Sequence, residues 1–228
     1  MNKTIYTDII GLIGEDGSLT EQPRFPENQL VFDNGLIAEY APGEIDGHIL
    51  YFNGFGFGSW QDAAGELLDA AVEDLKAGNL EAARAKLRSF GTSGRMLPEI
   101  EHFLDALRSS RDAVDQTSLQ RLARELLTEG TGTEEVKAGL CIAESFAELG
   151  IPILEDEIRT LAKCDEFTLF CIRIAEHLPD CENTLLEMGR HASVWGHIHL
   201  SEFAGQPPAD DLPEELAELF CPDFSLED

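Results

Sequence analysis

The sequence predicts a mainly α-helical protein in which an α-α helical-repeat solenoid follows a small N-terminal antiparallel β-meander. Three observations lead to this fold class. Apolar residues recur at helical spacing from about residue 59 onward, similar mid-helix segments return about every thirty residues, and β-branched and aromatic runs between turn signals fill residues 1–58. At 228 residues the chain is long enough to bury a core without disulfides or metals.

The N-terminal region, residues 1–58, is expected to be rich in β-strand. Ile5–Ile13 is one apolar run, and His48–Phe52 is another that suits a strand. Between them, Gln29–Phe32 and Leu36–Tyr40 flank Asp33-Asn34-Gly35, a turn sequence whose Asn and Gly tolerate positive φ. These segments together predict a hairpin and a small meander.

A glycine-rich junction, Gly54-Phe55-Gly56-Phe57-Gly58, leads into Ser59, a good N-cap, and a helix that opens with Trp60. A strand, glycines and a helix N-terminus in this order suggest either a phosphate-binding loop or a β-to-α connector. The spacing is G-x-G-x-G and no Lys-Ser/Thr follows, which favours the connector.

Residues 59–205 are predicted to form the helical-hairpin region. Leu67–Leu75 and Leu80–Phe90 each place their apolar residues on one helix face, and Gly78-Asn79 separates them with a turn that resembles the bend of a tetratricopeptide hairpin. The segments Pro98–Leu107 and Ser118–Leu127 form the next predicted pair.

The last third of the helical region contains an approximate internal repeat. Leu140–Ala143, Phe170–Arg173 and His197–Leu200 lie about thirty residues apart, and shorter predicted helices, Ile153–Ala162 and Asn183–Gly189, alternate with them. This layout is typical of a short HEAT-like solenoid, in which each helix pair buries its apolar face against its neighbours.

One local motif supports this interpretation. The nine residues Trp195 to Phe203, W-G-H-I-H-L-S-E-F, resemble a W-G-R-I-H-x-V-E-x-L stretch of uncharacterised bacterial HEAT-like helical proteins, with His197 in place of the arginine and Ser201 in place of the valine. The resemblance implies a structural role for Trp195, Gly196 and Ile198, in which the glycine lets helices approach closely. It implies an architecture and no known activity.

The acidic charge is the strongest functional signal. The chain has 44 Asp and Glu against 16 Lys and Arg, a formal net charge of −28. Coulomb repulsion disfavours direct binding to nucleic acid or an anionic membrane. The excess either serves solubility or attracts a basic protein partner.

The C-terminal tail, residues 206–228, carries only acidic charges and is the predicted partner-binding segment through Asp210, Asp211, Glu214 and Glu215. Its apolar residues follow helical spacing, so it is also expected to be able to dock back as a cap. These apolar residues are Leu212, Leu216, Leu219 and Phe220.

Motifs for catalysis or cofactor binding are not found in the sequence, which therefore predicts no catalytic, cofactor-binding or metal-binding residue. His191, His197 and His199 are close in sequence, but their spacing does not converge three ligands on one helix face. The alternative left open is a hydrolase or transferase with its site at the Gly54–Trp60 junction or in the His191–His199 cluster.

The preferred interpretation is a non-enzymatic protein-protein interaction module, for which a bacterial immunity or antagonist protein that covers a basic toxin is an attractive case. Five cysteines form an odd set without a C-x-x-C pair, and neither an export signal nor a membrane-spanning run is seen. We therefore expect a cytoplasmic protein. The sequence does not predict its oligomeric state.

Overall fold

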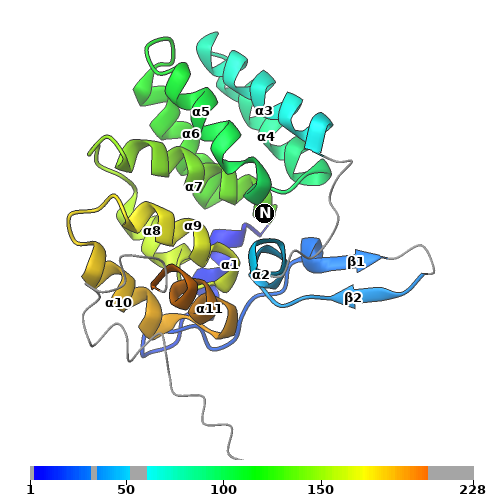
Figure 1. Cartoon of the computed structure of the whole chain (residues 1–228), viewed down its shortest axis with the longest axis vertical. Coiled ribbons are helices and arrows are strands. Elements are labelled where there is room, and N and C mark those ends of the chain that lie inside the picture. The colour runs from blue at the N-terminus through cyan, green and yellow to red at the C-terminus, as the bar shows by residue number, and fades with distance from the viewer. Residues whose placement is uncertain (1–2, 32–34, 52–60, 205–228) are drawn as a thin grey trace, which may run out of the picture.

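The computed structural model describes residues 3–31, 35–51 and 61–204, and these residues are mainly helical, as predicted (Figure 1). The helices are α1 (Ile5–Leu12), α2 (Glu44–Tyr51), α3 (Gln61–Lys76), α4 (Leu80–Ser93), α5 (Ile100–Ser109), α6 (Gln116–Glu129), α7 (Thr133–Ala147), α8 (Glu155–Leu161), α9 (Asp165–Ala175), α10 (Cys181–His191) and α11 (Val194–Ala204). Two strands, β1 (Gln29–Val31) and β2 (Ile37–Glu39), and two short 3₁₀ helices, η1 (Pro26–Asn28) and η2 (Leu97–Glu99), complete the described elements.

The predicted strand over Ile5–Ile13 is wrong, because this segment forms α1. Thr4 and Thr7 close a capping box at its start, in which each side chain accepts a hydrogen bond from the other residue's backbone N–H. Ile5 and Ile9, one helical turn apart, are buried, and α1 packs against α6 and α8. The β-branched run therefore provides an apolar helix face.

The predicted hairpin is confirmed. β1 and β2 pair antiparallel with Leu30 opposite Ala38, and the ribbon extends sideways from the helices (Figure 1). Gly35, on the far side of the turn, has φ of +79°, a conformation that favours glycine. The turn residues 32–34 lie outside the described residues.

The strand predicted over His48–Phe52 is also wrong. Residues up to Tyr51 belong to α2, which begins after Pro42-Gly43, and Phe52 lies outside the described residues. The Glu44 side chain accepts the Ala41 N–H at 2.7 Å, and Gly43 turns the chain with φ of +77°. The described part of the chain therefore has one two-stranded sheet in place of the expected meander.

Helix pairs follow, as the apolar spacing indicates. α3 and α4 form a hairpin around Gly78, whose φ of +76° ends α3 sharply. α4 continues beyond the predicted Leu80–Phe90 to Ser93, and Gly94 is its C-cap. α6 starts at the Asp115 cap and packs closely against α7.

α7 is the central helix of the fold. Thr133–Ala147 is buried at every position except Ser145, and the helix packs against α4, α5, α6 and α9. A helix enclosed in this way has no solvent-facing stripe. Its polar residues, including Glu134 and Lys137, consequently lie inside the protein.

The three segments of the predicted internal repeat lie in α7, α9 and α11. α9 packs against both α7 and α11, so these alternate helices follow one another through the molecule (Figure 1). α8 and α10 connect them, and each packs against α9. The stacking places the N-terminal ends of α7 and α9 near α2 and positions the site described below.

We find no helix in residues 3–31, 35–51 and 61–204 that is long and apolar enough to cross a bilayer.

Candidate functional site

The most unusual feature of the interior is a buried charge cluster around Lys137. The side chain of Lys137 on α7 is 0% exposed. Its Nζ donates to Glu166 Oε1 at 2.6 Å and to Asp46 Oδ2 at 2.8 Å. A third carboxylate, Glu134 Oε1, lies 3.1 Å from the same nitrogen. One lysine thus joins α2, α7 and α9, and its three donors match three carboxylates.

Lys137 keeps its charge in this environment. Burial by itself would lower its pKa, but the three surrounding carboxylates raise the pKa above its ordinary value. Burial also opposes ionisation of Glu166, yet the charge and the hydrogen bond of Lys137 outweigh it and lower the Glu166 pKa. The Lys137–Glu166 pair is therefore ionic even though water does not reach it.

The carboxylates of the cluster also hold backbone amides. Glu134 Oε2 accepts the Met96 N–H at 2.6 Å, just before η2. Glu166 Oε2 accepts the Gly43 N–H at 3.0 Å, just before α2, and Asn28 Nδ2 donates to the same oxygen at 2.9 Å. Backbone N–H groups at the start of a helix have no partner within that helix. Glu134 and Glu166 accept hydrogen bonds from such groups at the starts of η2 and α2.

Arg95 provides a second cation at the edge of the cluster. Its guanidinium lies 3.3 Å from Glu134 Oε1 and donates to the Glu27 carbonyl at 2.6 Å. Together the two cations face three carboxylates, so the cluster carries one acid more than its cations balance.

Asp46 is the carboxylate of the cluster whose pKa is raised. Burial raises its pKa to about 6, against the charge of Lys137, which lowers it. Its Oδ1 has no hydrogen-bond partner among the described residues. The excess negative charge of the cluster is therefore relieved most readily by a proton on Asp46.

A second buried acid, Asp165, fixes the start of α11. Asp165 is the first residue of α9, and its carboxylate accepts the Ser193 N–H at 2.9 Å and the Trp195 N–H at 3.0 Å. Gly196 lies against it, since a Cβ built at Gly196 would be 2.7 Å from Asp165 Oδ1. A glycine is needed for this close approach of α11 to α9.

Trp195 and Ile198 are only half-buried. The Trp195 indole lies across Gly47 of α2, where a Cβ would come within 2.3 Å of Cζ3, and its ring centroid is 5.6 Å from that of His48. The Trp195 side chain therefore lies against the N-terminal α2.

The three histidines of the predicted cluster are not brought together. Nδ1 of His191 lies 2.9 Å from Ser18 Oγ, and Nε2 of His197 donates to the Gly189 carbonyl at 2.9 Å. His199 is buried, and its Nδ1 lies 2.9 Å from the Tyr51 hydroxyl oxygen. Burial lowers the His199 pKa to about 4, so the ring is neutral at pH 7.

A separate network of arginines and acids joins α5, the C-terminal end of α7 and α9. Arg173 binds Glu144 through two hydrogen bonds, at 3.0 and 2.8 Å, and Arg108 binds Glu148 in the same two-pronged way. Ligand atoms of Glu144, Glu148 and His177 lie within 4.8 Å of one another, a grouping that could hold a cation. A metal would have to displace both arginines, so the arrangement is better suited to joining the helices.

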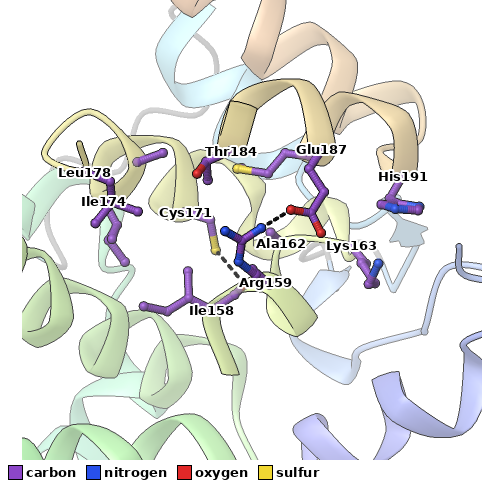
Figure 2. Close-up of a pocket in the computed structure, with 12 residues that line it drawn as sticks. Ile158, Arg159, Ala162, Lys163, Cys171, Ile174, Leu178, Thr184, Glu187 and His191 are labelled. Carbon is purple, nitrogen blue, oxygen red and sulfur yellow. Dashed lines mark hydrogen bonds and ion pairs between the residues drawn. The ribbon is translucent and has the colours of Figure 1, made fainter. Parts of the chain in front are cut away.

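A small pocket between α8, α9 and α10 contains Cys171 (Figure 2). Its cavity volume, about 20 Å³, suffices for about one water molecule. The Arg159–Glu187 ion pair spans it, and His191 lies beyond that pair, away from Cys171, in Figure 2. Burial raises the Cys171 pKa above its ordinary value, so a nucleophilic thiolate is not formed there.

In comparisons with known proteins, no protein family, curated protein or solved structure matches the chain. The other predicted sites, the Gly54–Trp60 junction and the tail acids Asp210, Asp211, Glu214 and Glu215, lie outside the described residues.

The Lys137 cluster was not predicted from the sequence. One signal was available, since Lys137 interrupts the otherwise small and apolar run Val136–Ala143 and has Glu134 one turn before it. A charged residue in such a run is either a snorkelling surface side chain or a buried ion pair. The distant partners Asp46 and Glu166 could not be paired with it from spacing alone.

Proposed function

We propose that this protein is a non-enzymatic acidic interaction module that binds a basic protein partner. The observation that carries the proposal is the use of the cations: thirteen of the sixteen Lys and Arg residues lie within 4 Å of a carboxylate of the protein itself. They are Lys3, Arg24, Lys76, Arg84, Lys86, Arg88, Arg95, Arg108, Arg121, Arg124, Lys137, Arg159 and Arg173. The Asp and Glu residues outside these ion pairs outnumber the three Lys and Arg residues that are not in this list.

The exposed face of α3 is an example of this unbalanced acidity. Glu66, Asp69 and Glu73 are exposed and follow one another at i, i+3 and i+7, along one side of the helix. His102 Nε2 lies 2.9 Å from Asp69 and Lys76 Nζ lies 2.6 Å from Glu73, so three acids of this stripe face one histidine and one lysine. Such a stripe attracts clustered Lys and Arg over a distance and raises the rate of encounter.

The buried location of the charge cluster supports a non-enzymatic role. A catalytic lysine or carboxylate has to meet a substrate, and Lys137, Asp46 and Glu166 are each at most 3% exposed. Their partners are amides and side chains that start other elements. The cluster therefore has a structural role, and we assign partner recognition to the exposed acids.

The finer parts of the proposal are the solenoid and the type of partner. The stacking of α7, α9 and α11 supports a HEAT-like arrangement of helix pairs, a scaffold suited to displaying an extended binding surface. A basic toxin whose nucleic-acid-binding surface is covered by acidic residues would fit the charge, which is the basis for proposing an immunity or antagonist role.

Capture from a native lysate at low salt tests the proposal. Wild-type protein is compared with an α3 variant, Glu66→Lys/Glu73→Lys, and with a tail variant in which Asp210, Asp211, Glu214 and Glu215 are changed to Lys. A control variant, Glu176→Lys/Asp180→Lys, reverses two exposed acids between α9 and α10. We expect a basic protein that is retained by the wild type and the control and is lost from one of the other two variants. Equal retention by all four proteins would contradict the proposal.

A further inference from the structure

A groove on the surface between α6, the C-terminal half of α7 and the segment leading into α8 has a cavity volume of about 640 Å³. Its floor is apolar, formed by Ala123, Ala143 and Phe146, and Ile153 and Leu154 form the opposite wall. A volume of this size exceeds the 20 Å³ of the Cys171 pocket many times and accommodates several apolar side chains.

The α6 side of the groove is basic, which is unusual in a chain of charge −28. Arg121 and Arg124 line it, and each is 62% exposed at its side chain. Arg121 Nε lies 3.3 Å from Glu125 and Arg124 Nε lies 3.3 Å from Glu157, which leaves the outer nitrogens of both guanidinium groups accessible. An acidic occupant can therefore bind along α6.

The acids near the groove determine the orientation of an occupant. Glu155 and Asp156 follow the Leu154 wall at the start of α8 and are exposed. An acidic segment is repelled on that side and attracted on the α6 side. The occupant should consequently be amphipathic, with its apolar residues towards Phe146 and its carboxylates towards Arg121 and Arg124.

The chain itself contains a segment with this chemistry. In residues 205–228 the apolar positions recur at i, i+4, i+7 and i+8, one face of a helix, and the charges are all negative. Pro213 is suited to the first turn of such a helix. The apolar residues are Leu212, Leu216, Leu219 and Phe220, and the acids beside them are Asp210, Asp211, Glu214, Glu215 and Glu218.

The length of chain after α11 is sufficient. α11 packs on α9, and α9 packs on α7, so two helix-to-helix spacings of about 8–10 Å, roughly 16–20 Å in all, separate the axis of α11 from that of α7, whose residues Ala143 and Phe146 line the groove. The seven residues 205–211 extend to about 23 Å, and Pro207-Pro208 favours an extended chain there. Leu212 can therefore reach the groove in the same molecule.

We propose that the groove between α6, α7 and residues 152–154 binds the acidic amphipathic C-terminal segment of the same chain. The apolar face of residues 212–220 covers Ala143 and Phe146. The carboxylates of Glu214, Glu215 and Glu218 supply further partners for Arg121 and Arg124, at the guanidinium nitrogens that Glu125 and Glu157 leave accessible. This inference goes beyond the proposed function, because it concerns the protein alone and holds or fails without a partner.

The test uses the tail cysteine, Cys221, as the attachment point of a nitroxide spin label on the full-length protein. Cys141, Cys164 and Cys171 are buried, and Cys181→Ser removes the half-buried cysteine. Methyl signals of Ala123, Ala143, Ile153 and Leu154 are then recorded by NMR. We expect these signals to lose most of their intensity, while methyl groups of α3 and α4 keep theirs.

A mixed sample separates binding within one molecule from binding between copies. Spin-labelled protein without isotopes is added to isotope-labelled protein without the spin label. The proposal predicts that the groove signals then keep their intensity. Groove signals that are broadened in the mixed sample as well would show that a second copy supplies the segment and would overturn the proposal, as would groove signals that keep their intensity in both samples.

Charge reversal on the groove provides the specificity control. Arg121→Glu/Arg124→Glu should restore the groove signals, and adding Glu214→Lys/Glu215→Lys should broaden them again. Arg190→Glu, an exposed arginine on α10, is the matched control and should leave the broadening unchanged. If the groove signals of Arg121→Glu/Arg124→Glu remain fully broadened, the arginines do not hold the segment and the proposal fails.

Discussion

Lys137 Nζ and Glu166 Oε1 lie 2.6 Å apart, with both side chains buried, and this contact ties the central helix α7 to α9. Asp46 brings α2 to the same lysine. Buried ion pairs contribute little net stability compared with apolar packing, but the loss of one partner leaves uncompensated charges without water. The helices are therefore held in one arrangement by groups that tolerate little change.

Replacing the lysine alone should be strongly destabilising. Lys137→Met leaves Asp46, Glu134 and Glu166 facing one another in the interior, and we expect a loss of about 3–5 kcal/mol in the free energy of unfolding. Chemical denaturation measures this. Adding Asp46→Asn and Glu166→Gln to Lys137→Met should recover part of the loss, and a triple variant no more stable than the single one would contradict the assignment.

Asp46 should make the protein less stable as the pH rises. Its pKa is raised from 3.8 to about 6 in the folded protein, so its contribution is fully present below pH 3.8 and is lost as the pH rises through 6. Asp46→Asn keeps an oxygen for Lys137 and removes the carboxylate. We expect the stability of the variant relative to wild type to increase by about 3 kcal/mol between pH 3.8 and 7, as measured by denaturation at each pH. A difference that does not change with pH would count against a buried, titrating Asp46.

His199 should make the protein less stable as the pH falls, opposite to the effect of Asp46. Its pKa is lowered from 6.5 to about 4, so its contribution is present above pH 6.5 and is lost as the pH falls through 4. In His199→Gln the acid-induced loss should be smaller than in wild type by about 3 kcal/mol. The pH dependence of the difference is the informative quantity, because losing the Tyr51 contact shifts stability at every pH. Parallel stability curves for the two proteins would refute this.

Trp195 and Gly47 should be energetically coupled. Trp195 is half-buried, so Trp195→Ala should cost about 2 kcal/mol, less than the ~3–5 kcal/mol of a fully buried aromatic residue. Gly47→Ala should cost about 1–3 kcal/mol in wild type, because the new Cβ would be 2.3 Å from Trp195 Cζ3. In the Trp195→Ala background the same change should be neutral or stabilising, since alanine favours a helix. Additive costs in the double variant would disprove the contact.

Turn residues and apolar spacing in the sequence predicted the hairpin, the α3–α4 turn and the amphipathic helices, because each of these depends on residues that are close in sequence. The hairpin around Asn34-Gly35 and the α3–α4 turn at Gly78 follow from residues that accept positive φ, and the amphipathic helices follow from apolar spacing. The errors at α1 and α2 have a different origin. Ile5 and Ile9 suit a strand as well as a helix, and packing against α6 and α8 decides between them.

The candidate site depended on long-range packing and was not predicted. Lys137 meets Asp46, which is 91 residues away in sequence, and Glu166, which is 29 residues away. Acids are so common in this chain that no single one could be selected as a partner. Nearly every residue of α7 is buried, so this helix has no exposed polar face. The usual sequence pattern that distinguishes a surface lysine from a buried one was therefore missing.

The proposed recognition of a basic partner is tested most directly by the salt dependence of association. The captured partner is purified, and its association and dissociation rates are measured by stopped-flow mixing between about 0.01 and 0.15 M salt, where the screening length falls from about 30 to about 8 Å. We expect a partner with clustered Lys and Arg, an association rate that falls about tenfold or more over this range, and a dissociation rate that changes little. An acidic partner, or an association rate that does not respond to salt, would contradict the proposal and leave the charge of −28 as a determinant of solubility.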